Sequence, residues 1–179
     1  MEKLILKDKS DEFYPQFLSL YDSSFPDFER RSHSALIETL KQKEFTQEIY
    51  VENSKLLALL SYWTFEKFAF LEYIAVDSSL RGSGIGSKVL GAFLAQLNGK
   101  TCILEIDPPV DYISKKRLRF YEKLGFKQTP YKSVQAYLKH NSGQILDILS
   151  HPQVLDNPAY EEFDRVYRQV ILNPAILHL

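Results

Sequence analysis

The segment between residues 81 and 87 is rich in glycine and is the part of the sequence best suited to binding phosphate. It consists of Arg81, Gly82, Ser83, Gly84, Ile85, Gly86 and Ser87. Glycine adopts backbone conformations closed to other residues and lets a ligand approach closely. A helix is predicted to follow, and the first N–H groups of a helix lack internal partners and attract anions. Arg81 adds a cationic fork. The segment therefore predicts a phosphate site at a helix N-terminus.

The spacing of the glycines distinguishes three kinds of phosphate-binding loop. The nucleotide-triphosphate loop needs a lysine directly after its last glycine, whereas Ser87 separates Gly86 from Lys88. The dinucleotide loop needs G-x-G-x-x-G, whereas the spacing here is G-x-G-x-G. A third pattern, R-x-x-G-x-G, is met by Arg81, Gly84 and Gly86. This pattern resembles the coenzyme A pyrophosphate loop of the GNAT superfamily of N-acetyltransferases.

Two further segments carry the same resemblance. Residues 72–77, before the loop, resemble the fourth strand of that family. Residues 119–126, about 40 residues after the loop, resemble its F-Y-E-K-L-G-F segment. Two motifs in the correct order and spacing are more specific than either alone. The resemblance covers roughly residues 4–149, and it implies a GNAT-like fold with acetyl-CoA (coenzyme A) as acyl donor and no metal.

The resemblance also implies which residues hold the coenzyme. The pyrophosphate is expected on the N–H groups of residues 81–87. The pantetheine arm is expected along three strand residues, Ile74, Ala75 and Val76. Ser114 stands where many family members have an asparagine that contacts this arm. Lys115 or Lys116 is a candidate contact for the 3′-phosphate, and a solvated basic helix face is the competing interpretation.

The family reaction is direct attack of an amine on the thioester carbonyl in a ternary complex. Tyr121 matches the tyrosine that protonates the departing thiolate in many members, and an ordinary tyrosine pKa of about 10 keeps it protonated at neutral pH. Packing of an aromatic helix residue on the sheet is the alternative. No cysteine nucleophile is required, and Cys102 alternates with Leu104 and Ile106 on a predicted strand. We therefore expect Cys102 in the core.

Glu72 is the predicted general base. A period of two places it on one strand face with four apolar residues, Phe68, Phe70, Ile74 and Val76. A carboxylate on an apolar face is costly unless paired, and its raised pKa suits a base. Glu105, near the end of the next strand, faces the same cleft if the strands splay, and a water is a third option. A structural ion pair with lysine or arginine is the alternative for each glutamate.

The acceptor is expected to be a primary amine, of a small molecule or of a protein or peptide. Its pocket is predicted from the first two helices and the later strands. The substrate-binding candidates are Glu29, Tyr73, Glu105 and Tyr137, with Asp27, Tyr62, Trp63 and Tyr131 as further lining. An aromatic and acidic pocket suits a cationic amine. Core packing of the aromatic strands, and helix capping by Asp27 and Glu29, are the alternatives.

Hydrophobic periodicity predicts the elements that position these residues. Helices are expected over residues 13–25, 29–43, 84–97, 112–124 and about 160–171. Strands are expected at residues 4–6, 48–51, 55–65, 68–76, 101–106, 126–137 and 144–149. This order predicts an α+β fold (an α/β mixed sheet) of six to seven strands with helices on both faces, and the resemblance to the GNAT superfamily implies that the sheet is splayed. Residues 1–150 are expected to form the acetyltransferase domain, and residues 151–179 are expected to form a helical extension that covers the sheet edge or makes a dimer contact.

Composition narrows the function further. The 22 Lys and Arg residues against 23 Asp and Glu residues leave a net charge of −1, without the basic excess of a nucleic-acid binder. A single cysteine excludes a disulfide framework and a multi-cysteine zinc site. No apolar run approaches the 18 or so residues of a membrane span. We expect a cytoplasmic monomer or homodimer.

Two other functions fit the loop. The first is a non-catalytic regulator that binds acyl-CoA on the same fold, with the acid and base idle, because fold does not establish activity. The second is a protein that binds a different phosphate ligand. Coenzyme binding without turnover favours the first, and stabilisation by ATP or NAD rather than by coenzyme A favours the second.

Overall fold

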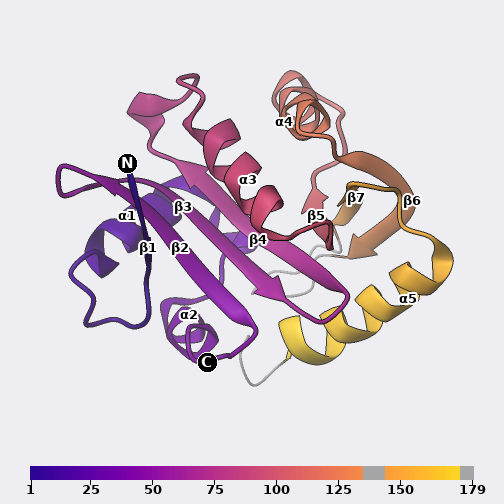
Figure 1. Cartoon of the computed structure of the whole chain (residues 1–179), viewed down its shortest axis with the longest axis horizontal. Helices are drawn as coiled ribbons and strands as arrows, with labels where there is room; N and C mark the ends of the chain where they lie inside the picture. Colours follow the sequence, from indigo (N-terminus) through magenta and orange to yellow (C-terminus); the bar gives the residue numbers. More distant parts are fainter. Residues whose placement is uncertain (135–143, 174–179) are drawn as a thin grey trace.

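The computed structural model describes residues 1–134 and 144–173, and these residues form one mixed seven-stranded sheet flanked by helices (Figure 1). The strands are β1 (Glu2–Ile5), β2 (Phe45–Glu52), β3 (Lys55–Thr64), β4 (Phe68–Val76), β5 (Thr101–Ile106), β6 (Lys127–Val134) and β7 (Ile145–His151). Their order across the sheet is β1-β2-β3-β4-β5-β7-β6. Neighbours are antiparallel except β4 and β5, which are parallel. The predicted mixed sheet is confirmed.

Helices cover both faces of the sheet. The helices are α1 (Tyr14–Ser24), α2 (His33–Thr39), α3 (Ile85–Gln96), α4 (Tyr112–Lys123) and α5 (Asn157–Val166). One face packs against α3 and α4, and the other packs against α1, α2 and α5. Two 3-10 turns, η1 (Asp27–Glu29) and η2 (Ser78–Leu80), precede α2 and α3, and a π turn, η3 (Tyr167–Ile171), continues α5.

The second helix is shorter than its sequence pattern predicted. We expected a helix over residues 29–43, whereas the chain forms η1 and then α2 over His33–Thr39. The hydroxyl of Ser32 accepts a hydrogen bond from the Ala35 N–H at 3.1 Å and caps the helix. A side-chain cap satisfies N–H groups that the helix leaves free, so it fixes the start at this residue. Residues 27–32 therefore remain outside the helix.

Strand β4 contains a β-bulge. Tyr62 of β3 pairs with Leu71, whereas the preceding residue, Ser61, pairs with Tyr73. Glu72 is thus the extra residue on β4. A bulge bends the strand and shifts the alternation of its side chains by one position.

This bulge overturns one expectation. Phe68 and Phe70 pack with the cluster under α5, whereas Ile74 and Val76 pack with the cluster under α3. The prediction that Glu72 shares one face with all four of these residues is therefore wrong. The period-two pattern fails because an extra residue enters the strand at Glu72.

Strands β4 and β5 pair only over the first four residues of each strand. The parallel ladder joins Phe68–Leu71 to Thr101–Leu104 and ends there. Beyond it, β4 continues to Val76 beside β3, and β5 continues to Ile106 beside β7. The two strands therefore separate in the middle of the sheet, which confirms the predicted splay.

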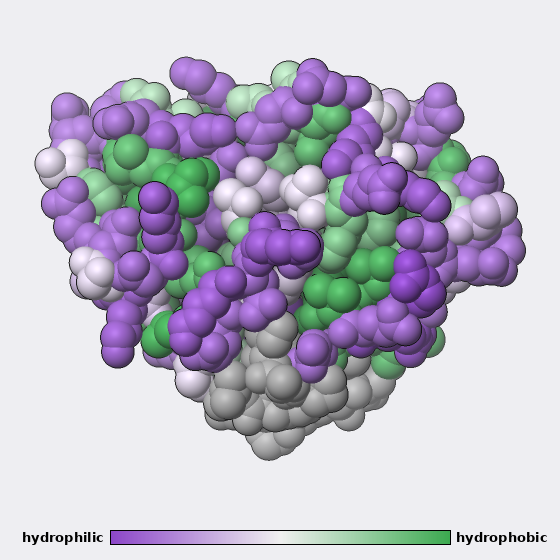
Figure 2. Space-filling view, turned by 60° about the horizontal axis from the view of Figure 1, so that its bottom comes forward, coloured by the Kyte–Doolittle hydropathy of each residue, from purple (hydrophilic) through white to green (hydrophobic). Residues whose placement is uncertain are grey.

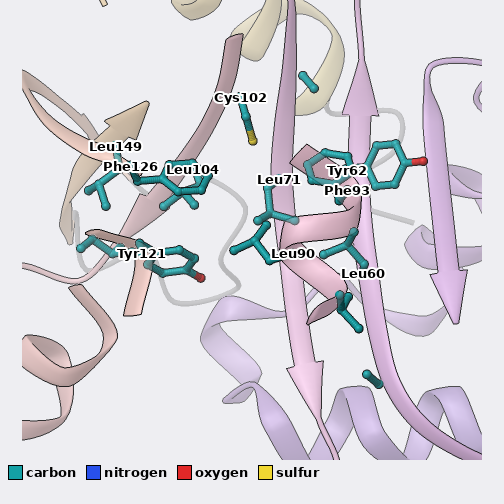
Figure 3. Packing of buried hydrophobic residues seen from close by; sticks show 14 of the residues in the cluster. Leu60, Tyr62, Leu71, Leu90, Phe93, Cys102, Leu104, Tyr121, Phe126 and Leu149 are labelled. Atoms are coloured by element: carbon teal, nitrogen blue, oxygen red, sulfur yellow. The ribbon is translucent and has the colours of Figure 1, made fainter. Parts of the chain in front are cut away.

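One hydrophobic core lies between the sheet and the helices α3 and α4. Figure 3 shows Cys102, Leu104, Leu71 and Leu90 in this cluster, together with Tyr121. Cys102 has no exposed surface, and burial raises the pKa of its thiol far above the usual range. A protonated, inaccessible thiol is inert, as expected for this residue.

The surface is mixed in character. On the face shown in Figure 2, hydrophobic residues lie in several groups separated by hydrophilic ones. Among the described residues, none of the helices is long and apolar enough to cross a membrane. Within the same residues, no cluster of His, Cys, Asp or Glu is arranged to hold a metal ion.

Candidate active site

A cavity of about 790 Å³ lies where β4 and β5 separate. Its walls come from η1 and the end of α1, the second half of β4, the glycine segment, the end of β5 and one side of α4. Splayed strands open a passage between the two faces of the sheet. Side chains from opposite faces can therefore reach one cavity, which an unbroken sheet would prevent.

The glycine segment forms the entrance to α3. Gly82 and Gly84 have φ values of +85° and +87°, in the left-handed region that other residues rarely adopt. A Cβ atom at either position would meet nothing within 4 Å. Gly84 is also the N-cap of α3, and no side chain caps this end. The first residues of α3 line the cavity, and their N–H groups lie uncapped at the positive end of the helix dipole, which is the arrangement that binds phosphate.

The glycine segment is held close to its neighbours at one point. A Cβ atom on Gly86 would lie 3.5 Å from Val76 of β4 and 3.7 Å from Phe120 of α4. These are ordinary van der Waals distances, so α3 packs directly against both elements at this position. Arg81 and Lys116 add positive charge to the cavity wall, and Lys115 is not among its lining residues.

The structure places most of the predicted coenzyme residues in the cavity wall. These are Ile74, Ala75, Val76, Arg81, Gly82, Gly84, Ile85, Gly86 and Ser87. Ser83 is outside it, and its hydroxyl donates to the Leu80 carbonyl at 2.6 Å. Ser114 is also outside, because it forms a capping box with Asp111. The Ser114 N–H donates to Asp111 Oδ1 at 2.7 Å, and the Asp111 N–H donates to Ser114 Oγ at 3.0 Å. The structure therefore gives the Ser114 hydroxyl a helix-capping role.

Tyr121 reaches the cavity from α4. Figure 3 shows its hydroxyl pointing away from Phe126 and Leu149, toward the strand that carries Leu71. The side chain is buried, and no partner for its hydroxyl lies among the described residues. Burial raises the pKa of Tyr121 to about 12, so the hydroxyl keeps its proton at neutral pH. The group is a proton donor placed at the separation of the strands.

Glu72 lies in a buried ion pair. Arg31 Nε donates to Glu72 Oε1 at 2.7 Å, and the Trp63 indole donates to Oε2 at 2.7 Å. The side chains of Arg31 and Glu72 have no exposed surface. Both carboxylate oxygens thus accept strong hydrogen bonds, one of them from a cation. These two hydrogen bonds fix the position of the Glu72 carboxylate group.

Glu105 has a different environment on the neighbouring strand. Tyr167 donates to Glu105 Oε2 at 3.0 Å, and Oε1 is buried without a partner among the described residues. Burial, assisted by the charge of Glu72, raises the pKa of Glu105 to about 7, while the nearby hydroxyls of Tyr167 and Ser133 act to lower it. Among the residues that the structure describes, no cation forms an ion pair with Glu105. The carboxyl group therefore changes its protonation state near neutral pH.

The far wall of the cavity is acidic and aromatic. Glu29 of η1 lines it, and burial raises the pKa of its carboxyl group, with Asp107 adding to the rise and Arg117 opposing it. Tyr73 also lines the cavity and donates to the Glu29 carbonyl at 2.9 Å. Arg117 pairs with Asp107 at 2.7 Å. Among the described residues, Glu29 takes part in no ion pair.

The other predicted lining residues lie elsewhere. Tyr62 donates to Glu48 at 3.0 Å on the α3 face, and Trp63 packs in the core under α5. Tyr131 stacks on Tyr160, with ring centroids 3.9 Å apart. Asp27 pairs with Arg30 on the surface. Tyr137 lies outside the described residues. Of the predicted acceptor residues, the structure brings together Glu29, Tyr73 and Glu105.

The sequence matches a known family over most of this region. The sequence model of the acetyltransferase (GNAT) family matches residues 12–126, which include β4, the glycine segment, β5 and α4. The chain belongs to the GNAT acetyltransferase family. The cavity thus lies where the matched segment has its splayed strands and its glycine-rich helix entrance.

Relatives of known structure and sequence agree with this assignment. A Bacillus subtilis (strain 168) protein named "Putative acetyltransferase YjbC" is 33% identical over 105 residues. These residues are 58% of this chain, and they span only 52% of the length of that relative. A GNAT-family structure from Bacteroides thetaiotaomicron superposes with a TM-score of 0.84 at 23% identity, over 96% of this chain and 98% of the other. The Arabidopsis thaliana Naa50 complex with the bisubstrate analogue CoA-Ac-MVNAL superposes with a TM-score of 0.60 at 18% identity, over 84% and 98%.

Sequence reasoning missed two residues of the site. Arg31, which pairs with Glu72, belongs to a polar segment before α2. Tyr167, which bonds Glu105, belongs to the C-terminal extension and reads as one apolar position of an amphipathic helix. Neither carries a local motif. The lone signal for Arg31 was the need for a cation beside a glutamate on an apolar strand.

Proposed function

We propose that this protein transfers an acetyl group from acetyl-CoA to a primary amine, with Glu105 as general base and Tyr121 as general acid. The observation that carries the proposal is the placement of these two side chains at the strand separation, next to a glycine-rich helix entrance. The family membership supports the donor. The assignment of the base departs from the sequence prediction of Glu72, for reasons that the contacts supply.

The donor side of the cavity fits coenzyme A. The uncapped N-terminus of α3 and the open space at Gly82 and Gly84 suit a pyrophosphate. The backbone of Ile74–Val76, on the side of β4 that β5 has left, is free to accept an extended arm as a sheet edge accepts a strand. Arg81 and Lys116 supply positive charge beside it. When bound, acetyl-CoA supplies the thioester carbonyl that the amine attacks.

In the proposed mechanism Glu105 takes a proton from the amine, and Tyr121 gives a proton to the thiolate. The ammonium group of the acceptor first gives one proton to solvent, and as the neutral nitrogen then forms the carbon–nitrogen bond, its second proton passes to Glu105, directly or through one water. As the carbon–sulfur bond breaks, Tyr121 donates its proton to the thiolate. Glu105 suits the first role because its pKa of about 7 leaves it ready to take a proton at neutral pH. Glu72 suits it less, because Arg31 and Trp63 occupy both of its oxygens.

The acceptor is expected to be a cationic amine that enters beside Glu29 and Tyr73. A negative carboxylate and aromatic rings stabilise an ammonium group as it approaches. A small-molecule amine and a protein or peptide amine both fit this chemistry. The competing function is a regulator that binds acyl-CoA without turnover. The cavity gives it less support, because binding alone needs neither a neutral tyrosine hydroxyl nor a carboxyl group that titrates near pH 7.

The function is tested by ligand stabilisation followed by turnover. Melting temperature is measured with acetyl-CoA, longer acyl-CoAs, ATP and NAD, and we expect only the coenzyme A thioesters to raise it. Release of free coenzyme A is then followed with a panel of mono-, di- and polyamines, amino acids and N-terminal peptides. Binding of acetyl-CoA with no acetyl transfer across the panel favours the regulator. Stabilisation by ATP or NAD alone overturns the assignment of the donor.

Tyr121→Phe tests the acid. We expect kcat to fall by about 10- to 100-fold, because the thiolate loses its proton donor. The affinity for acetyl-CoA should stay within about twofold, because the ring remains in place. Phe126→Leu, a change in the same cluster remote from the hydroxyl, is the control for packing. A Tyr121→Phe variant with wild-type kcat would remove Tyr121 from the mechanism.

A further inference from the structure

Tyr167 lies outside the segment that the family shares, yet it contacts the proposed base. The match to the family ends at residue 126, and Tyr167 belongs to η3 at the end of α5. Its hydroxyl donates to Glu105 Oε2 at 3.0 Å, and its side chain is buried. The hydrogen bond joins a late segment of the chain to the centre of the cavity.

The packing around Tyr167 fixes the direction of its hydroxyl. Its ring lies edge-on to Phe70 of β4 at 5.4 Å and next to Phe163 of α5 at 5.3 Å. The Leu172 N–H donates to the Tyr167 carbonyl at 2.8 Å, which closes the π turn. A π turn inserts one extra residue into a helix and turns the following side chains, and such turns are frequent at functional sites. The local geometry therefore aims this tyrosine at β5.

Arg31 holds the same turn from the other side. Its Nη2 donates to the Ile171 carbonyl at 3.0 Å, while its Nε pairs with Glu72. Both bonds are buried, and Trp63 lies beside the guanidinium with its ring centroid 5.7 Å away. One cation thus links β4 to η3. The ion pair at Glu72 fixes the turn that carries Tyr167, and so it contributes to the position of the hydrogen bond at Glu105.

We infer that Tyr167 is a positioning residue for Glu105, and that the C-terminal turn η3 completes the catalytic site. This inference rests on the proposed function, because it requires Glu105 to be the base. The hydroxyl of Tyr167 holds one carboxylate oxygen, Oε2, and the other, Oε1, has no partner among the described residues. It also favours the charged form of Glu105, which is the form that accepts a proton.

The charges around Glu105 give the direction of the effect. Glu72 on β4 opposes ionisation of Glu105, whereas the hydroxyls of Tyr167 on η3 and Ser133 on β6 favour it. Arg31 is paired with Glu72, and Tyr160 of α5 is a further titratable group whose pKa the charge of Glu105 raises. The Tyr167 pKa is held well above its usual value, so this hydroxyl remains a donor throughout. Loss of the Tyr167 hydroxyl must therefore raise the pKa of Glu105.

The test is a titration that needs no known acceptor. The full chain is labelled with glutamate carrying carbon-13 in its side-chain carboxyl group, and Glu105→Gln identifies the Glu105 resonance by its disappearance. We expect a midpoint near pH 7 in the wild type. In Tyr167→Phe the midpoint should rise by about one to two pH units, the worth of one hydrogen bond to a charged group. In Tyr160→Phe, the control whose hydroxyl donates instead to the Lys132 carbonyl, it should stay within about 0.3 units.

Turnover provides the second readout once an acceptor is found. The midpoint of the pH dependence of kcat should move upward in Tyr167→Phe by the same amount, while kcat at high pH stays within about twofold of wild type. Circular dichroism and acetyl-CoA affinity confirm that the variant is folded. An unchanged Glu105 midpoint in folded Tyr167→Phe overturns the inference and leaves the proposed function standing. Wild-type transfer by Glu105→Gln overturns the base assignment instead, whatever the titration of Tyr167→Phe shows.

Discussion

The donor side and the acceptor side of the cavity are built in different ways. On the donor side, seven consecutive residues, 81–87, present backbone N–H groups at the start of α3. On the acceptor side, Glu29, Glu105, Tyr121 and Tyr167 come from four elements that are far apart in the chain. The donor side depends on backbone conformation, and the acceptor side depends on the burial and pairing of charges. Substitutions on the two sides should therefore fail in different ways.

Glu105→Gln should give the largest effect on the acceptor side. We expect kcat to fall by about 100- to 1,000-fold, because the amine loses its proton acceptor. The affinity for acetyl-CoA should not change. In the wild type, kcat should rise with pH up to about 7, where Glu105 becomes ionised, and then level off. Wild-type turnover in this variant, with the same pH profile, would show that the acceptor side does not depend on this charge.

The same variant should be more stable than the wild type at high pH. Because the folded pKa of Glu105 is raised from 4.5 to about 7, ionisation of this group costs the folded state free energy. The cost is absent below the unfolded pKa, grows as pH rises to about 7 and is constant above it. We expect Glu105→Gln to gain on the order of 3 kcal/mol in unfolding free energy at pH 8 over the wild type. Near-equal stability at pH 4, below the unfolded pKa, is the internal control.

Glu72→Gln separates charge pairing from proton transfer on the same side. The substitution leaves Arg31 buried without a countercharge, which should lower the unfolding free energy by about 3 kcal/mol. Glu38→Gln removes one partner of the exposed Glu38–Lys41 pair and should change it by less than about 1 kcal/mol. Denaturant unfolding measures both. A stable Glu72→Gln variant that has lost turnover would return the role of base to Glu72.

Gly84→Ala should give the smallest of these effects, and it acts on the donor side alone. Gly84 and Gly99, at the two ends of α3, have φ values of +87° and +84°, and a Cβ atom meets nothing at either. Alanine should therefore cost each about 1 kcal/mol of stability through backbone strain. Only Gly84→Ala moves the N–H groups of the helix entrance, so we expect its Kd for coenzyme A to rise by about five- to tenfold. Equal Kd values in the two variants would argue against a phosphate site at this entrance.

The donor side comes from one short segment and the acceptor side from distant elements, and for this reason the sequence predicts the two sides unequally well. The helix that follows Gly84, strand β5 and helix α4 all follow from local periodicity, and the structure has them within about two residues of the expected bounds. The splay of the sheet followed from the family resemblance. These features depend on residues that are neighbours in the chain, so a pattern within a short window contains the information.

The acceptor side could not be predicted in the same way. The bulge at Glu72 arises from the pairing of β4 with β3, and no local signal marks it. Without the bulge, Glu72 was placed on the wrong apolar row, and its pairing with Arg31 was not foreseen. Ser114 is predicted to contact the coenzyme, yet the hydroxyl oxygen of Ser114 accepts a hydrogen bond from the Asp111 N–H in the capping box of α4. The contact between Tyr167 and Glu105 joins residues 62 positions apart, and only packing brings them together.

The order of the strands has a consequence for how the chain folds during synthesis. Strand β7 lies between β5 and β6, although it follows both in the chain. Until residues 145–151 leave the ribosome, β5 and β6 each carry a bare edge that can pair with another chain. The C-terminal part of the chain therefore closes the sheet and supplies Tyr167 in the same late step. A nascent chain that is released early would lack the partner of its base and would expose two aggregation-prone strands.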